Sequence, residues 1–427
     1  MTKRRVVVTG MGLVTPCGQG WQPYWEAVLQ AQSSIRYFSN LHLNGFSAKI
    51  AGEIPDFNPE KFVKIRKTLK VMSREIQLAI AASQLAVQDA GIALESEDLQ
   101  RFGLSLGTGI INNDLDEMGI GIRTAVGEAG TFEMSKFGQE GIRSLFPLWL
   151  LKYLPNMPAC HISILHGLRG PSNTITTSAS AGTQAVGEAA RVIERGDADV
   201  MLAGGTDSKL NAMGISRFHL LNLLSHQNHV PESAYCPFDI RHDGIVLGEG
   251  AGLLVIEELE HARARHANIY AEISGYGSSS DFNHDPRCGE DSHGKSAAMQ
   301  AALSDAGTGP DAVGLIVANG SGIPQEDIQE ACAIRGIFEK VLDSVKVTGV
   351  KPITGHLVYG SGGVELAAAV LAVHKKVVPP LANLEVPDPE CELPFAVGKA
   401  QPRELKNVLF NSFGFGGQNA CLVVSSL

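Results

Sequence analysis

Apolar and polar positions along the chain alternate between two kinds of segment. Short, continuous apolar runs bordered by glycine indicate strands that are buried on both faces. These runs lie at 6–10, 103–109, 200–205, 252–257, 315–320, 345–349 and 420–425. Helical spacing of apolar residues fills the gaps at 73–90, 181–195, 294–306, 326–338 and 364–375. The alternation predicts an α/β protein in which helices cover sheets.

Two of the predicted helices carry a face with almost no side-chain bulk. In the helix 181–195, alanines recur at 181, 185 and 189. The helix 364–375 likewise has alanines at 367, 368, 369 and 372. Such helices can pack with their backbones close to their neighbours, which suits an inner layer. Since each half of the chain holds one of them, we predict two similar halves, residues 1–258 and 259–427.

One long segment interrupts the first half. Residues 110–157 combine Asn112-Asn113, several acidic residues and an aromatic-apolar run, Phe146 to Leu151. We expect this insertion to form a partner surface. A second polar stretch, 278–296, is rich in Ser, Asp, His and Gly and is typical of a surface excursion.

Composition and charge narrow the function classes. Glycine accounts for 47 of the 427 residues, and charged residues make up 19%, below the usual level of about 25%. This composition excludes an intrinsically disordered chain and a coiled coil. The net charge is −10, and basic residues form no long block, so we expect neither nucleic acid nor a membrane surface as a partner.

Cysteine spacing argues against metal sites and disulfides. The seven cysteines lie far apart, without a CxxC pair, at 17, 160, 236, 288, 332, 391 and 421. The apolar start, Val6 to Val8, is too short for a signal peptide, and no apolar run approaches the ~18 residues that span a bilayer. We expect a cytoplasmic protein without a metal ion or cofactor.

The first segment with candidate chemistry is a predicted strand-to-helix turn at 173–182. Small residues, Ser178-Ala179-Ser180, follow a β-branched run and lead directly into the small-faced helix. Nucleophiles often sit at such turns because the positive end of the helix stabilises a thiolate or alkoxide. The alternative interpretation is that Ser178 and Ser180 only cap the helix.

Several further motifs follow in a fixed order. They are Val8 to Pro16, Pro237-Phe238-Asp239, Gly248 to Gly252, Asn319 to Pro324 with Asp327 and Glu330, Lys351 to His356, and Asn411 to Gly417. In order and spacing they closely resemble the type II β-ketoacyl-acyl carrier protein synthases, over essentially the whole chain. This family includes the paired ketosynthase and chain-length-factor subunits of type II polyketide systems. The resemblance implies a dimer and the thiolase fold, with two similar halves stacked as a five-layered αβαβα sandwich.

The resemblance also implies a catalytic cysteine and two histidines, and this chain departs from that set. Ala179 stands at the nucleophile position and Asn319 at the first histidine position, while His356 retains the second. A methyl group cannot accept an acyl chain, and an amide cannot exchange a proton near neutral pH. The other positions carried over are Lys351, Asp327, Glu330 and the gating phenylalanine, Phe413.

The retained residues also have structural interpretations. Lys351 and Glu330 are candidates for a buried ion pair that joins two loops, and breaking such a pair is costly whether or not catalysis occurs. His356 is a candidate for satisfying a backbone carbonyl. For these residues a structural role is expected ahead of a chemical one.

A chain-length factor is the function that the resemblance implies for a chain with these losses. Such a subunit pairs with an active ketosynthase and shapes the tunnel in which the acyl or polyketide chain grows by decarboxylative Claisen condensation on acyl carrier protein. By position, the residues expected to line the partner's tunnel are Ile110, Asn112, Asn113 and Met118, with part of 134–150. The second partner is the carrier protein, with its phosphopantetheine-bound acyl or malonyl chain.

Three alternatives stay open at this point. The first is an active β-ketoacyl synthase captured as a Cys-to-Ala variant at Ala179. The second is a serine acyltransferase that uses Ser178 or Ser180, although neither aligns with the nucleophile. The third is a plain scaffold. A malonyl decarboxylase is not expected, because Ala179 lacks the amide that stabilises an enolate in many chain-length factors.

Overall fold

In the described part of the chain, eleven strands form one continuous sheet: ten follow one path made of two five-stranded halves, and the short β2 (Gly18–Gln19) pairs with β1 off that path. The computed structural model describes residues 4–38, 46, 48–281 and 292–427, so residues 282–291 of the expected surface excursion, Cys288 included, lie outside the described residues. The first half runs β1 (Val6–Thr15), β8 (Glu249–Glu258), β7 (Val200–Ser208), β5 (Phe102–Gly107) and β6 (Ser172–Ile175). The second runs β9 (Ala271–Ser280), β15 (Gln418–Ser425), β14 (Asn407–Phe413), β10 (Val313–Val317) and β11 (Lys346–Thr348).

The two halves repeat the same strand directions. In each, the first three strands pair antiparallel, and the third to fifth pair parallel. A short antiparallel contact of Val7 and Val8 in β1 with β9 joins the halves. Parallel strands need crossover connections, and the helices supply them on both faces of each sheet.

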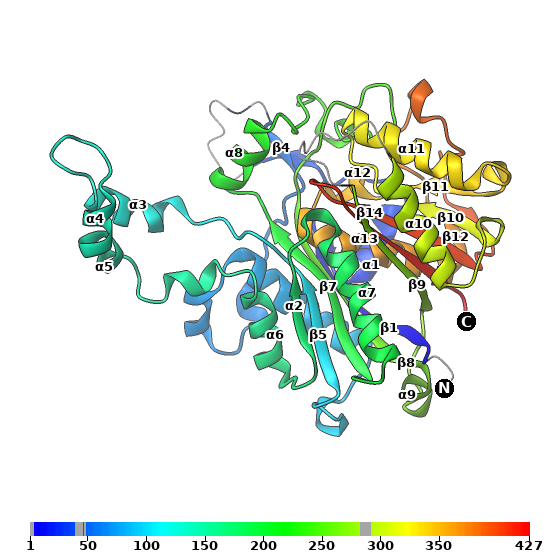
Figure 1. Cartoon of the computed structure of the whole chain (residues 1–427), viewed down its shortest axis with the longest axis horizontal. Helices are drawn as coiled ribbons and strands as arrows, with labels where there is room; N and C mark the ends of the chain where they lie inside the picture. The colour runs from blue at the N-terminus through cyan, green and yellow to red at the C-terminus, as the bar shows by residue number, and fades with distance from the viewer. Residues whose placement is uncertain (1–3, 39–45, 47, 282–291) are drawn as a thin grey trace.

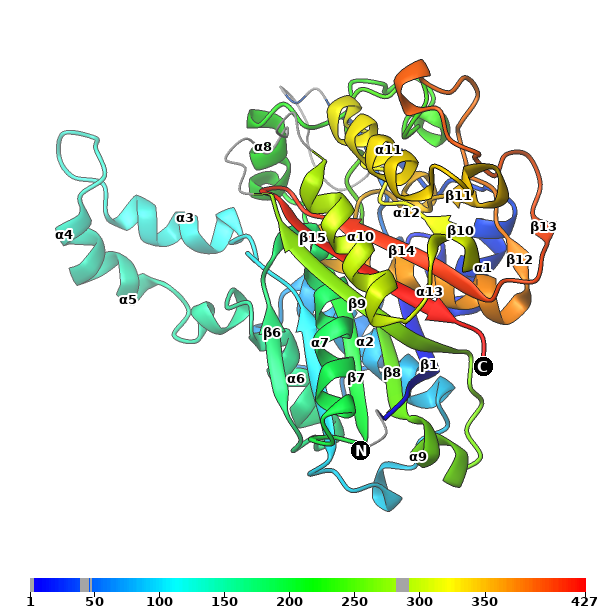
Figure 2. The same cartoon turned by 45° about the vertical axis from the view of Figure 1, so that its right-hand side comes forward.

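Helices form three layers around the two sheet halves (Figures 1 and 2). The small-faced helices, α7 (Ala181–Glu194) and α13 (Ser361–Lys375), lie between the sheets and contact strands of both halves. Outside the first sheet lie α2 (Arg74–Asp89) and α6 (Met157–His166), and outside the second lie α10 (His293–Asp305) and α11 (Pro324–Phe338). The predicted fold class, the thiolase-type five-layered sandwich, is therefore confirmed. Within the described ranges, no helix has the length and apolarity to cross a membrane.

Glycines allow the inner layer to pack backbone against backbone. A Cβ built on Gly363 of α13 would lie 1.9 Å from the carbonyl oxygen of Gly252 in β8, and one built on Gly252 would lie 2.5 Å from the amide nitrogen of Val364. Real Cβ atoms do not approach that closely. The high glycine content of the chain is thus used, in part, to bring strand and helix backbones into contact.

The seven strands and five helices predicted from the pattern are all present, but two central strands and the helix α6 were not predicted. The strands β9 and β14 were not predicted as such. In β9 only alternate residues are buried over most of its length, and the sequence Ala-Glu-Ile-Ser-Gly-Tyr-Gly-Ser-Ser-Ser mixes small and polar residues. Glycines in this strand leave room for α10, since a Cβ on Gly277 would lie 2.1 Å from the Ala298 oxygen.

The insertion forms an arm that projects from the body (Figures 1 and 2). It contains α3 (Leu115–Thr124), α4 (Met134–Lys136), the π-helical η4 (Phe137–Gly141) and α5 (Ile142–Ser144). Exposed apolar side chains are frequent along it, namely Leu115, Ile120, Ile122, Phe132, Met134, Ile142, Phe146, Leu148 and Leu150. Exposed apolar side chains gathered on one segment are typical of interaction sites, so the partner surface expected for this insertion stays a prediction.

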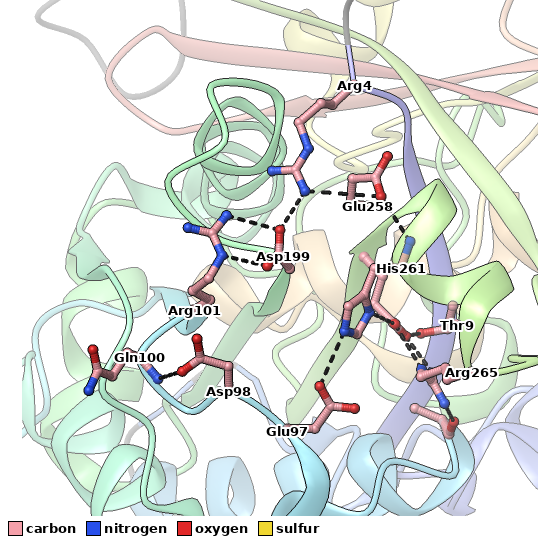
Figure 3. Close-up of polar contacts among 12 residues, drawn as sticks. Arg4, Thr9, Glu97, Asp98, Gln100, Arg101, Asp199, Glu258, His261 and Arg265 are labelled. Carbon is pink, nitrogen blue, oxygen red and sulfur yellow. Dashed lines mark hydrogen bonds and ion pairs between the residues drawn. The ribbon is translucent and has the colours of Figure 1, made fainter.

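A polar network ties the start of the chain to the first half (Figure 3). Glu257 in β8 is fully buried and accepts hydrogen bonds from Thr9, His261 and Arg265. Burial alone would raise the pKa of Glu257, but these hydrogen bonds outweigh it and lower the pKa. Asp199 binds Arg101 and Arg4, and the Arg101 contact is the main reason that its pKa falls to about 2.

We expect Gly363→Ala to destabilise the protein by about 3 kcal/mol or more, because the added methyl group meets backbone atoms that cannot move independently. Gly336→Ala is the matched control. Gly336 is exposed in α11 and a Cβ there meets nothing within 4 Å, so this change should be neutral or should stabilise by about 0.5–1 kcal/mol. Denaturant unfolding at one protein concentration measures both. Equal effects would show that the inner layer tolerates side chains.

Candidate active site

Ala179 lies at the turn between β6 and the inner helix α7. It is the middle residue of a single 3-10 turn, η6 (Ser178–Ser180), and is only 1% exposed. Ser412, near the end of β14, donates a hydrogen bond of 3.2 Å to the Ala179 carbonyl. The expected place of residue 179 at the start of a helix is thus what the structure has.

The two neighbouring serines do not cap α7, which corrects one of the two interpretations of this turn. Ser180 occupies the N-cap position, but no side chain makes a capping hydrogen bond there. Its hydroxyl instead donates to the Thr177 carbonyl at 2.8 Å. Ser178 has a φ of +58°, a conformation that costs free energy for a residue with a Cβ. The sharp turn, rather than a cap, is what these residues provide.

Asn319 follows β10 and is held by its side-chain oxygen. Lys351 Nζ donates to Asn319 Oδ1 at 3.1 Å and to the Asn319 carbonyl at 2.6 Å, and the Phe413 amide donates to Oδ1 at 3.2 Å. These donors fix the amide orientation. Asn319 Nδ2 is consequently the hydrogen-bond donor that this 3% exposed residue has left for another group.

Two acidic residues of α11 hold the surrounding loops. Glu330 accepts from the amides of Asn319 and Gly320, both at 2.8 Å, and from Asn411 Nδ2 at 3.1 Å. Asp327 accepts hydrogen bonds from the backbone amides of Gly322 and Phe238 and from the His242 ring. Both carboxylates are occupied by the protein itself, so their role is to position loops.

The predicted ion pair between Lys351 and Glu330 is wrong. Lys351, at the start of α12 (Lys351–Thr354), pairs instead with Glu365 of α13 at 2.8 Å. The two side chains are 1% and 2% exposed. Glu330 is unavailable because backbone amides take its oxygens. Sequence reasoning had no means to choose, since Glu365 lies inside an apolar, alanine-rich helix that carried no motif.

His356 also departs from its expected role. The prediction was that it satisfies a backbone carbonyl, yet its Nδ1 accepts a hydrogen bond of 3.0 Å from the Val358 amide. The proton of the neutral ring is therefore on Nε2, and in the described part of the chain this buried atom has no partner. Burial, and next the charge of Lys351, lower the pKa of His356 well below its usual value. His356 is a neutral donor at pH 7.

The loop after β14 brings these groups together. Along it, Ser412 contacts Ala179, Phe413 contacts Asn319, and Phe415 stacks on the His356 ring with centroids 5.3 Å apart. Phe415 was missed in the sequence, where only the first phenylalanine of Phe-Gly-Phe-Gly-Gly was singled out. Phe413 is 4% exposed and packs in the core of the second half, whereas half-buried Phe415 faces the histidine.

The expected tunnel residues lie apart from this group. Ile110 is 57% exposed, and Asn113 is half-buried. Asn112 is 8% exposed with neither side-chain polar atom paired among the described residues, and together with Asn113 it lines an open cavity of about 940 Å³. Met118 lines a separate cavity of about 100 Å³ on the arm, with Phe146 and Trp149. Ile110 is therefore a surface residue, whereas Asn112 is buried beside an open cavity.

Two models of one family match this chain, the β-ketoacyl synthase N-terminal domain over residues 3–262 and its C-terminal domain over 270–385. The chain belongs to the β-ketoacyl synthase family. A 3-oxoacyl-[acyl-carrier-protein] synthase 2 from Vibrio harveyi is 36% identical, with both chains covered in full, and one from Staphylococcus aureus (strain COL) is 36% identical over 98% of each.

Solved structures of the family superimpose over the whole chain. The ishigamide ketosynthase/chain length factor is similar at a TM-score of 0.88 and 28% identity, covering all of both chains. AntDE:AntF, a type II polyketide acyl-carrier protein in complex with its ketosynthase, gives a TM-score of 0.85 at 29% identity, also with full coverage. Family membership and fold therefore agree with the β-ketoacyl synthase resemblance.

Chemically, the site of this β-ketoacyl synthase family member offers two hydrogen-bond donors and, at residue 179, a methyl group. The Nε2–H of His356 and the Nδ2–H of Asn319 are donors suited to a carbonyl oxygen or oxyanion. The methyl group of Ala179 cannot form a thioester. With the pKa of His356 far below neutrality and an amide at 319, neither group exchanges a proton at pH 7.

We expect Lys351→Met to destabilise the protein by about 3–5 kcal/mol, because it leaves Glu365 as an unpaired buried charge. Lys376→Met is the control, since the Lys376–Glu404 pair is 61% and 77% exposed and should contribute no more than about 1 kcal/mol. Replacing both buried partners, as Lys351→Met with Glu365→Leu, should recover most of the loss. Denaturant unfolding would refute the pair's role if the single and double variants were equally unstable.

Proposed function

We propose that this chain is the catalytically inactive, chain-length-factor-like subunit of a ketosynthase heterodimer. It shapes the tunnel of an active ketosynthase during decarboxylative Claisen condensation on acyl carrier protein. The observation that carries the proposal is Ala179, a buried methyl group at the turn where the family needs a nucleophile. A subunit without that nucleophile cannot hold the growing chain, so its part in the reaction is to shape the space around it.

Asn319 separates this proposal from an engineered Cys-to-Ala form of an active synthase. A synthase inactivated by design needs only the Cys-to-Ala change at position 179. This chain also has Asn319 at the position of a catalytic histidine. Its amide is integrated into the structure through Lys351 and Phe413. A residue so well accommodated in a fully buried network supports a natural loss of catalysis.

The surface supports a second chain on the side of the arm. The edge strand β6 pairs only with β5 within the described sheet, and its first residues, Ser172 and Asn173, are exposed. In Figure 2 the arm leaves the body on this side. An unpaired strand edge next to exposed apolar side chains is typically buried by a partner. We propose that an active ketosynthase subunit is that partner.

A basic surface cluster supports docking of the carrier protein on this chain. Around η1 (Pro59–Lys61) and η2 (Arg66–Val71), the exposed basic residues are Lys61, Lys64, Arg66, Lys67 and Lys70. In the sequence these basic residues are interrupted by apolar ones, so they do not form a continuous basic block. On a chain of net charge −10, a local basic patch is what an acidic carrier protein requires.

The first test restores the thiol. With acyl- and malonyl-carrier protein as substrates, the purified chain carrying Ala179→Cys should form no 3-ketoacyl product, because Asn319 and the neutral His356 cannot complete the chemistry. Mass spectrometry of the carrier protein detects the product. An engineered active synthase would instead recover condensation, and a serine acyltransferase would give, without any substitution, a mass gain on this chain from the acyl-carrier-protein donor. Either result would overturn the proposal.

The second test changes the tunnel in a complex with an active ketosynthase subunit. Ile110→Ala should lengthen the product and Ile110→Trp should shorten it, because a packed tunnel end limits length by volume. Ile240→Ala is the control, since Ile240 is equally exposed at 57% and lies far along the chain. Products are compared by mass spectrometry, and an unchanged distribution in both Ile110 variants would contradict the tunnel role.

A further inference from the structure

The carboxyl ends of three parallel strands meet next to Ala179. The strands β6, β5 and β7 are neighbours in this order. The segments that follow them carry Ala179, Ile110 and Lys209 respectively. Ligands of parallel α/β sheets bind at this edge, so an acyl chain attached at position 179 of this chain would run toward the segment after β5.

Tyr359 fills the space beside that segment. It lies in η10 (Val358–Gly360), and a Cβ built on Gly109 would lie 1.9 Å from the Cζ atom of its ring. Its carbonyl oxygen would lie 3.1 Å from a Cβ built on Gly182, at the start of α7. Tyr359 therefore reaches from the helix that follows Ala179 to the backbone that precedes Ile110, with glycines making room at both contacts.

Lys209 locks this ring in place. Its Nζ atom donates a hydrogen bond of 2.8 Å to the Ile110 carbonyl, pairs with Asp207, and lies 5.2 Å from the centroid of the Tyr359 ring. The Lys209 and Asp207 side chains are 5% and 2% exposed. An alkyl chain that displaced Lys209 would leave Asp207 as an unpaired buried charge, which is costly. An ammonium group over an aromatic face adds further attraction.

We propose that Tyr359 and Lys209 close this chain's own acyl pocket. This inference rests on the proposed function, because it assumes a tunnel shared with a partner. The backbone of Ile110 is held inward by Lys209, while its side chain is 57% exposed. The closed pocket directs this tunnel residue outward. A growing chain then extends only from the partner's nucleophile. This subunit has no open acyl pocket of its own in which to bind that chain.

The experiment uses a two-armed probe on the full chain carrying Ala179→Cys. An α-bromoacyl pantetheine amide carries a pantetheine arm like that of the carrier protein's acyl group, so its alkyl tail takes the place of the acyl chain in the pocket. The introduced sulfur attacks the α-carbon, a C–S bond forms as the C–Br bond breaks, bromide leaves and the thiol proton passes to solvent. A bromoacetyl probe, which has no tail, is compared with a bromododecanoyl probe by mass spectrometry of the peptide that contains position 179.

With Tyr359 in place, the bromoacetyl probe should react at least about tenfold faster than the bromododecanoyl probe, relative to their rates with a free thiol. Tyr359→Gly should reduce this preference toward one. Tyr359→Phe keeps the ring and should retain the full preference, which makes it the matched control. Tyr359→Ala is a second opening variant in case the glycine form folds poorly, and the comparison of the two probes on Ala179→Cys alone needs no opening variant.

Equal relative labelling by both probes with Tyr359 intact would overturn the closed pocket. So would a preference that stays the same in a folded opening variant. Neither result bears on whether Ile110 sets product length in a partner, which the product distribution of the complex decides. The two proposals can therefore fail separately.

Discussion

The close approach of backbones in the inner layer is the constraint on which the rest of the structure depends. Helices α7 and α13 pass between two sheet halves where glycines at 252 and 363 leave no room for a side chain. Protein interiors are close-packed, and this inner layer cannot absorb even one extra methyl group without strain. The packing of the inner layer therefore fixes how the two halves sit against each other. The turn with Ala179 begins one helix, and the segment with His356 begins the other.

From that frame follows a site whose parts are positioned by buried polar contacts. The Lys351–Glu365 pair joins the loop before α13 to the helix itself, and Lys351 also orients Asn319. The loop after β14 touches Ala179, Asn319 and His356 in turn. This β-ketoacyl synthase family member thus holds its donors firmly around a site that carries a methyl group at residue 179 and an amide at residue 319.

Sequence reasoning succeeded where a property depends on local pattern. Small residues at helical spacing predicted the inner helices, and motif order predicted both the fold and the location of Ala179 at a strand-to-helix turn. It failed where a side chain had several candidate partners. Lys351 was paired with Glu330 rather than Glu365, His356 was expected to donate to a carbonyl, and Ser178 and Ser180 were considered as caps. In each case the decisive partner is remote in the chain or is a backbone group.

The amino-acid sequence by itself determined the family, the layered α/β class and the absence of a sulfur or imidazole at positions 179 and 319, because these follow from residue identity and order. Only the tertiary structure decided what those residues face. Burial makes His356 a neutral donor, backbone amides occupy Glu330, and the Tyr359 ring is pressed against Gly109 beneath Lys209. Such outcomes depend on desolvation and on competition among nearby groups, and both arise only when distant segments pack together.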